Sequence, residues 1–253
     1  MIAEPALYRL LTWSSPGYPT GAFSYSHGLE WAVETGDVAN LQGLLDYVTG
    51  VLERGGGWID AVLFAHAWRV TPKSGETAAR TEPGSLAEPI TPAVLNPLAK
   101  LDTVAQLAAA FRSSSETALE SRQQGGAFLD VTRKAWPHPT LDAFAARQAE
   151  AGGAPVAHCI AVAVTCAAHE VALPPALHAY LHAVAANLVS AGARLIPLGQ
   201  TQAQIAIARL SLIITGIVER ALATSLDDLG TAAPAIELCS LRHETQYTRL
   251  FRS

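Results

Sequence analysis

The chain has 253 residues, of which 50% are hydrophobic and 15% charged, and its formal net charge is -5. This length can form one large domain or two small ones around a sizeable apolar core. The acidic balance and the absence of a Lys/Arg cluster in the sequence argue against a surface that follows nucleic-acid phosphates. Three cysteines, an odd number within or beside apolar segments, favour reduced thiols and a cytoplasmic protein.

Residues 21–30, GAFSYSHGLE, bring hydroxyls, an imidazole and a carboxylate close together near the amino end. Ser26 and Glu30 are four residues apart, as are Phe23 and His27, so on a helix each pair would brace the other. The segment also holds the group types of a hydrolytic triad, but no Gly-x-Ser-x-Gly elbow surrounds either serine. Capping and packing, catalysis, and recognition of a partner all stay open, and we favour recognition.

Two amphipathic helices are predicted next. Apolar residues recur at three- and four-residue intervals from Leu41 to Leu52, after the N-cap residue Asn40 and before the glycines at 55–57. The pattern resumes over 59–66. We expect the two segments to form a helical hairpin.

Residues 70–100 change in composition to Pro, Thr, Ser, Glu and Gly, with five prolines that no continuous helix could accommodate. We interpret this stretch as a mobile loop; a boundary between two domains is the alternative. Helical spacing resumes after Asp102 and is predicted to run as one helix to Arg133, before the prolines at 137 and 139. Its polar face would pass through Glu116, Glu120 and Arg122.

The most apolar stretches are residues 156–168 and 205–218. Both fall short of the roughly 20 residues that a membrane span requires. Their β-branched residues favour strands, yet each stretch lies in a long alanine-rich frame, so we expect buried helices. The sequence as a whole predicts an all-α protein, 1–253, with roughly eight to ten helices in one bundle.

Candidate metal ligands are few. His178 and His182 share a helix face through their i,i+4 spacing, but a zinc site needs at least a third protein ligand. Cys159 and Cys166 lie in an apolar helix near two histidines, and such thiols usually belong to the core. No Gly-x4-Gly-Lys-Ser/Thr loop is present to hold a nucleotide phosphate.

The later parts of the chain contain two further segments of interest. Residues 194–199, RLIPLG, interrupt two helical patterns and form either a simple turn or part of a polar surface. The last residues combine Tyr247, Leu250 and Phe251 with several arginines, a composition typical of interface hot spots. We favour a tail that becomes ordered on binding a second protein; the alternative is a tail that folds back over the chain's own core.

Three separated segments of this sequence resemble the UreF family of urease accessory proteins, namely residues 21–30, residues 194–201 (RLIPLGQT) and residues 241–253 (LRHETQYTRLFRS). Shorter likenesses between them extend the resemblance over nearly the whole chain, except about 70–100. It implies an all-helical single domain that acts in the cytoplasm, in the maturation of urease by nickel insertion. It implies no catalytic residue, cofactor or resident metal.

The resemblance also implies partners. The chain would bridge the urease-binding protein UreD (also called UreH) and the GTPase UreG in the assembly that serves the urease apo-enzyme, commonly as a homodimer, and could bias the GTPase cycle. Neither a membrane nor a nucleic acid is implied. Partner-binding residues carried over from the motifs are Ser24, Tyr25, His27, Glu30, Arg194, Gln200, Arg242, His243, Glu244, Tyr247, Arg249 and Leu250.

Those residues suggest two faces. We expect the tail, taken as 231–253, to bind UreD, and the segment 21–30 to face UreG or to line a route for nickel between proteins. The rival interpretation is a metal-dependent hydrolase on a helical bundle, which would use His178, His182 and a distant carboxylate such as Glu170.

Overall fold

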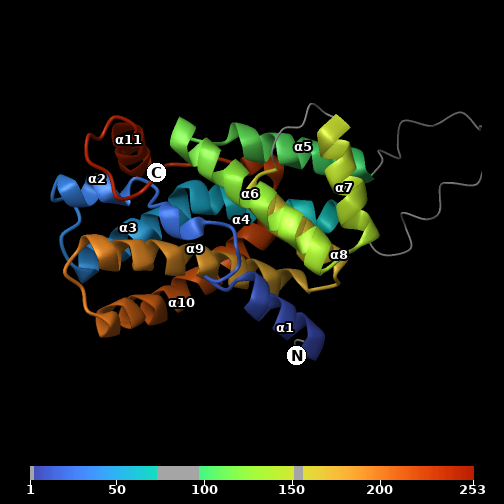
Figure 1. Ribbon diagram of the computed structural model, residues 1–253, viewed down its shortest axis with the longest axis horizontal. Helices are drawn as coiled ribbons and strands as arrows, with labels where there is room; N and C mark the ends of the chain where they lie inside the picture. The colour runs from blue at the N-terminus through green and yellow to red at the C-terminus, as the bar shows by residue number, and fades with distance from the viewer. Residues whose placement is uncertain (1–2, 73–96, 151–155) are drawn as a thin grey trace, which may run out of the picture.

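The computed structural model describes residues 3–72, 97–150 and 156–253 and folds them into helices without a strand (Figure 1). The helices are α1 (Glu4–Trp13), α2 (Leu29–Glu34), α3 (Leu41–Arg54), α4 (Gly56–Val70), α5 (Pro97–Ala110), α6 (Ser115–Ala135), α7 (Pro139–Glu150), α8 (His158–Ala168), α9 (Leu173–Leu195), α10 (Gln200–Ala223) and α11 (Pro234–His243). The prediction of an all-α bundle is confirmed.

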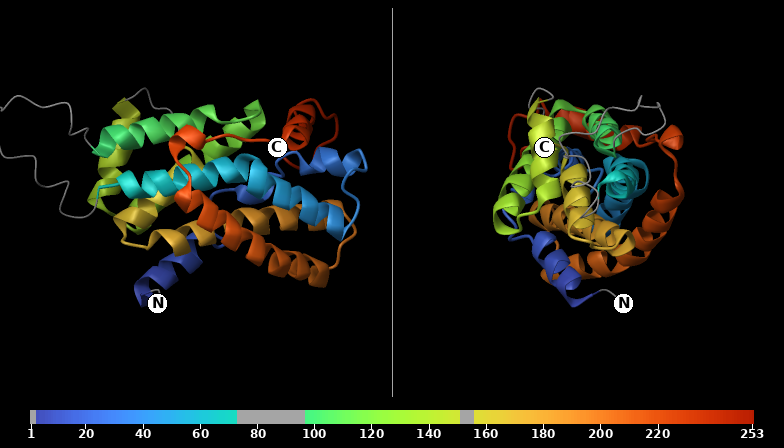
Figure 2. Two further views of the ribbon diagram at one scale, coloured as in Figure 1. Left: turned by 180° about the vertical axis from the view of Figure 1, so that it is seen from behind. Right: turned by 90° about the vertical axis from the view of Figure 1, so that its right-hand side faces the viewer.

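Two helices, α4 and α8, form the centre of the bundle. Every residue of α8 from Cys159 to Ala168 is buried, and α4 buries residues around most of its circumference. A helix that is apolar all round must be covered on all sides. The covering is supplied by α3, α5, α6, α7, α9 and α10, which surround the central pair in the views of Figures 1 and 2.

The apolar stretches 156–168 and 205–218 are helical, as predicted, and lie in α8 and α10. Within the described ranges, no helix is both long enough and apolar enough to cross a bilayer. The turn that follows Leu195 returns the chain so that α9 and α10 pack side by side.

The predicted hairpin between the second and third helical segments is wrong. Asn40 does cap α3, since its side chain accepts a hydrogen bond from the Gly43 amide at 3.0 Å. Only Gly55 separates α3 from α4, however, and a hairpin needs a connection of about two to five residues. The two helices therefore follow one another end to end as a bent rod (Figure 2).

The single helix predicted from Asp102 to Arg133 is also wrong. The chain breaks between α5 and α6, where the Ser114 hydroxyl accepts from the Thr117 amide at 3.1 Å and the Thr117 hydroxyl accepts from the Ser114 amide at 3.2 Å. This reciprocal capping box starts a new helix. The sequence contained the cap, but the apolar pattern on both sides of it concealed the break.

The proline-rich stretch predicted as a mobile loop, 70–100, lies mostly outside the described residues. Its first residue ends α4 and its last residues begin α5. The alternative of two domains divided at this stretch is not favoured, because α4 and α5, on either side of it, pack against one another in the same core.

Close contact between α6 and the start of α8 depends on Gly125. A Cβ atom at this position would lie 1.9 Å from the carbonyl oxygen of Val156, whereas at the next residue, Gly126, a Cβ would meet nothing within 4 Å. These neighbouring glycines therefore offer a matched pair for measuring how tightly the two helices are packed.

We expect Gly125→Ala to destabilise the fold by about 2 kcal/mol, because backbone has to move to admit the methyl group. Gly126→Ala should instead stabilise it by about 0.5–1 kcal/mol through the higher helix propensity of alanine. Urea unfolding followed by circular dichroism measures both. Equal effects of the two substitutions would contradict the close approach of α6 and α8.

Candidate functional site

The three segments that stood out in the sequence meet at one end of the bundle, where α2, α11 and the last residues of the chain lie together (Figure 1). The first segment is not the helix that its spacing suggested. Residues 22–24 form a 3-10 turn, and both His27 and Gly28 have positive φ angles, 54° and 76°. Ser26 lies before α2, which begins at Leu29, and its hydroxyl oxygen accepts a hydrogen bond from the Glu30 amide at 3.4 Å, so the two residues are joined at the start of the helix and not side by side along it.

Gly28 allows α11 to pass directly over this turn. A Cβ atom there would lie 2.5 Å from the backbone nitrogen of Ser240 and 2.8 Å from the carbonyl carbon of Cys239. Its left-handed conformation also favours glycine. The backbone of α11 therefore packs directly on the backbone of Gly28, with no side chain between them. This close approach brings the tail within reach of α2.

The Glu30 carboxylate holds the tail from within. One of its oxygens, Oε1, accepts a hydrogen bond from the Leu250 amide at 2.6 Å, and Oε2 accepts from the Phe251 amide at 2.9 Å. Glu30 is buried, and so is the Phe251 side chain. Hydrogen bonds to an ionised acceptor are about twice as strong as neutral ones, so this carboxylate is a main anchor of the tail.

A second carboxylate reaches the tail from α6. The His243 ring, which is completely buried, lies between Glu30 Oε2, 3.1 Å from its Nε2, and Glu116 Oε2, 2.7 Å from its Nδ1. The other oxygen of Glu116 accepts from the Arg249 guanidinium at 2.5 Å. His243 and Arg249 thus tie α11 and the tail to both α2 and α6.

A third carboxylate, Glu120, holds the last residue and the first segment together. Its Oε2 accepts from the Ser253 hydroxyl at 2.8 Å, and its Oε1 lies 2.9 Å from His27 Nε2. The Ser26 amide donates to Ser253 O at 2.6 Å. We refer to Glu30, Glu116, Glu120, His27 and His243 as the tail-anchoring cluster.

The charge of the cluster affects His27. Burial lowers the pKa of this imidazole, but the Glu120 carboxylate, through its charge and its hydrogen bond, raises it by more, so the pKa lies above its ordinary value. A raised pKa means that the protonated ring stabilises the folded state. This stabilisation is fully present at acid pH and is lost as the pH rises through the folded-state pKa.

The central turn joins the cluster through one residue. Arg194, near the end of α9, donates to the Phe23 carbonyl at 2.9 Å, and its guanidinium lies over the Phe251 ring, 4.4 Å from the centroid. Gln200 starts α10 and is exposed, and within the described part of the chain no hydrogen bond connects it to the tail. The structure therefore brings Arg194, but not Gln200, to the other two segments.

The remaining predicted residues differ in their exposure. Tyr247 is fully exposed, Leu250 is 64% exposed, and Arg242 is exposed beside them. Glu244 accepts from the Ser115 amide and hydroxyl at 2.8 Å, at the start of α6. Two residues of the first segment have other roles. The buried Tyr25 donates to Gln123, and the Ser24 carbonyl accepts from the Arg252 amide.

The tail is therefore packed against the body of the protein. Of the two alternatives left open by the sequence, the structure shows the tail folded back over its own chain and not awaiting a partner to become ordered. Glu116 and Glu120 are the functional residues that the sequence analysis missed. They were assigned only to the polar face of a long helix, although their i,i+4 spacing after a Ser cap put two carboxylates on one face of α6.

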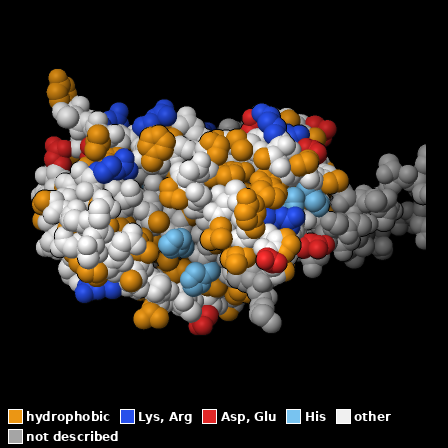
Figure 3. Space-filling model, turned by 60° about the horizontal axis from the view of Figure 1, so that its bottom comes forward, with side chains coloured by type: hydrophobic (Ala, Val, Ile, Leu, Met, Phe, Trp, Pro, Cys, Tyr) orange, Lys and Arg blue, Asp and Glu red, His pale blue; other side chains and the backbone are white. Residues whose placement is uncertain are grey.

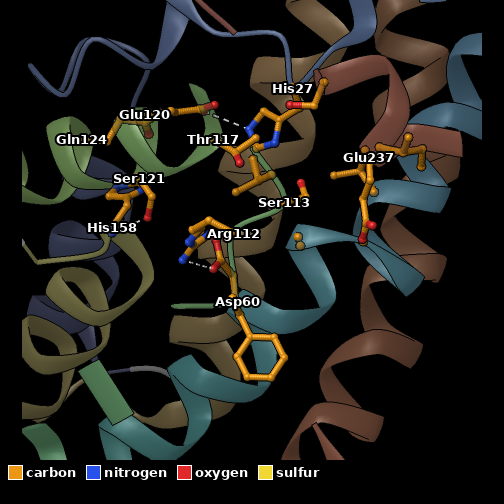
Figure 4. Close-up of a pocket in the computed structure, with 18 of the residues that line it drawn as sticks. His27, Asp60, Arg112, Ser113, Thr117, Glu120, Ser121, Gln124, His158 and Glu237 are labelled. Carbon is orange, nitrogen blue, oxygen red and sulfur yellow. Dashed lines mark hydrogen bonds and ion pairs between the residues drawn. The ribbon is translucent and has the colours of Figure 1, made fainter. Parts of the chain in front are cut away.

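A polar cavity of about 70 Å3 lies beneath the cluster (Figure 4). His27 and Glu120 point toward one another at one end, and Asp60 and Arg112 are paired at 2.8 Å at the other. Tyr180 donates to the second Asp60 oxygen at 2.7 Å. Burial alone would raise the pKa of Asp60, but the Arg112 charge and these hydrogen bonds lower it below its ordinary value.

The cavity offers no activated nucleophile among its described residues. Burial lowers the pKa of His158 to about 4, so its ring is neutral at pH 7, and burial raises the pKa of the adjacent Cys159 thiol well above its ordinary value. A thiol reacts as its thiolate, which is scarce here. Cys166 is likewise buried in α8, as expected of a core thiol.

The rival metal site is not assembled. His178 and His182 lie on α9 and line an apolar groove of about 670 Å3 with residues of α1 and α10 (Figure 3), while Glu170 lies in the turn before α9. Across the three described ranges, no three His, Cys, Asp or Glu side chains are grouped so that they could hold a metal ion.

The fold and the cluster thus define an all-α protein in which three separated segments of sequence share one buried network. The UreF family model matches residues 38–211. The urease accessory protein UreF of Rhodopseudomonas palustris (strain TIE-1) is 49% identical over 250 residues, with 98% of this chain and 92% of the relative covered. That of Granulibacter bethesdensis is 48% identical, with 99% and 95% covered. The chain belongs to the UreF family of urease accessory proteins.

We expect Glu30→Gln to release the tail, because an amide cannot accept from the Leu250 and Phe251 amides with both of its atoms. The loss should be about 2 kcal/mol of unfolding free energy, together with faster amide hydrogen exchange over residues 244–253. Glu150→Gln, which changes an exposed carboxylate at the end of α7, is the control and should change stability by less than about 0.5 kcal/mol. Unchanged exchange in Glu30→Gln would refute the anchoring role.

Proposed function

We infer that this chain is a cytoplasmic adaptor in the maturation of urease, in which nickel reaches the apo-enzyme, and that it joins UreD (also called UreH) to the GTPase UreG. Membership of the UreF family supports this role. Nickel is the cargo of the process, and we assign it no site on this chain. The proposal rests on the structure of the tail. Its backbone is held by buried groups, while the side chains of Tyr247 and Leu250 are exposed to solvent.

The outward side of α11 and the tail is the surface proposed for UreD. Leu238, Leu241, Tyr247 and Leu250 are exposed there, with Arg242 next to them. Aromatic residues and arginines supply many interface hot spots. Because the backbone beneath these side chains is already ordered, the tail would lose little conformational entropy when a partner binds.

The surface proposed for UreG lies around the first segment and the central turn. Phe23 is 66% exposed, Arg194 lies next to it, and Gln200 is exposed at the start of α10. His27 and Glu30 point into the tail-anchoring cluster, so we propose that they position this surface without contacting UreG. A partner bound here could bias the GTPase cycle of UreG through the same surface.

A homodimer is the oligomeric state that we propose, with the groove between α1, α9 and α10 as its interface. Leu11 of α1 is 66% exposed beside this groove and Leu212 of α10 is 81% exposed. Apolar side chains gather on one side of two histidines in Figure 3, and the groove itself is lined by leucines of α1 and α10. Apolar surfaces of this kind are typical of homodimer interfaces.

The tail assignment is tested with Tyr247→Ala combined with Leu250→Ala. Both side chains are exposed, so stability should stay within about 0.5 kcal/mol, while the affinity for UreD should fall about 30-fold. Isothermal titration calorimetry gives the affinity, and urease activity in cells that carry the variant gives its consequence. Wild-type affinity in the double variant would exclude the tail surface.

The dimer is tested with Leu11→Asp, which places a charge in the apolar groove. We expect a shift from dimer to monomer in sedimentation velocity, because the interface would have to bury an unpaired carboxylate. Leu238→Asp puts the same charge on the tail surface and should leave the dimer intact. A monomeric wild-type protein would overturn the proposed interface.

A further inference from the structure

His243 is placed so that its proton decides whether the tail is held. The ring is completely buried, and each of its two nitrogens faces a carboxylate on a different helix, Glu30 of α2 and Glu116 of α6. Arg249 is bound to the other oxygen of Glu116. From α3, the titratable group that lies near α11 is Tyr47, and burial raises its pKa well above the ordinary value, so it stays protonated.

The chemistry of imidazole makes this arrangement depend on charge. A neutral ring has one N–H donor and one acceptor nitrogen, whereas the protonated ring has two donors. An ionised carboxylate only accepts. While both carboxyl groups are ionised, both bonds can form together only with the protonated ring, and after loss of a proton one nitrogen lone pair of His243 would face the oxygen of a buried carboxylate.

His27 adds a second contribution of the same sign. It lies against Glu120, which also holds the Ser253 hydroxyl. Burial and the Arg112 charge lower the pKa of His27, but Glu120 and Asp60 together raise it by more, so the protonated ring stabilises the closed arrangement. When His27 loses its proton, Glu120 loses a charged partner. The two histidines therefore anchor different parts of the tail, and both do so in their protonated forms.

We propose that the tail-anchoring cluster is a proton-dependent switch, which holds residues 244–253 on the body when His243 and His27 are protonated and releases them as the pH rises. Release moves Tyr247 and Leu250 away from the positions in which the packed tail presents them. The switch itself is a property of this chain alone. Only its effect on UreD binding rests on the proposed function.

The wild-type chain tests the switch directly. Amide hydrogen exchange is measured for peptides of the tail at about pH 6 and at about pH 8.5, with each rate divided by the intrinsic rate at that pH and compared with buried amides of α9. We expect the corrected exchange of the tail to rise about tenfold over this range, while α9 stays constant. A tail that follows α9 at both pH values would overturn the proposal.

Two matched variants identify the histidine. In His243→Gln the side-chain amide can donate to one carboxylate but presents its oxygen to the other, so the tail should exchange fast at both pH values. His66→Gln is the control, because His66 makes a single bond, to the Thr224 carbonyl at 2.9 Å, that glutamine can also make. It should keep the wild-type pH dependence. Wild-type pH dependence in His243→Gln would refute the role of His243.

The wild-type measurement stands even if His243→Gln fails to fold, which circular dichroism at about pH 6 detects. Binding of UreD is then measured at both pH values. Weaker binding at the higher pH supports the switch and the assignment of the tail to UreD. A tail that is released while UreD binding is unchanged supports the switch and overturns that assignment, so failure of one idea is distinguished from failure of the other.

Discussion

This end of the molecule depends on the Glu30 carboxylate, which accepts hydrogen bonds from the Leu250 and Phe251 amides and contacts the His243 ring. A buried carboxylate is costly unless it is fully hydrogen-bonded, and here the bonds come from residues more than 200 positions later in the chain. The Glu30 carboxylate thus has its hydrogen-bond donors only when the tail is in place. The same hydrogen bonds therefore anchor the tail and stabilise α2.

This arrangement also explains why the described part of the protein contains several buried ionisable groups. Glu116 and Glu120 lie one helical turn apart on α6, and each holds a different part of the tail and contacts a histidine. Buried polar networks of this kind specify one arrangement of the backbone. In the adaptor role proposed above, this fixed arrangement of exposed side chains is what a partner would recognise.

Local signals in the sequence were sufficient for much of the fold. The Asn40 cap and the alanine-rich frames of α8 and α10 were interpreted correctly, because each depends on neighbouring residues. Connections were harder. The single residue Gly55 continues α3 into α4, and the Ser114 cap divides what the apolar pattern joined. In each case the backbone geometry at a single residue determines the connection, and the spacing of apolar residues contains no information about that geometry.

The candidate site was predicted in part for the same reason. The three segments were found as stretches of unusual composition, but their meeting point was not, since the pairing of His243 with Glu116 joins residues 127 positions apart. For Glu30, packing against the chain itself was one of the alternatives left open, but recognition of a partner was favoured. A carboxylate in a polar motif reads as a contact for a partner, and only its burial shows that it binds its own chain.

The order in which the network forms follows from its position in the chain. Residues 243–253 are synthesised after every group that they contact, while the amino-terminal parts of a protein begin to fold during synthesis. A nascent chain would therefore leave Glu30 and Glu120 without these hydrogen-bond donors until residues 243–253 have been synthesised. Assembly with a partner at the tail surface would in this way be restricted to chains that already carry this segment.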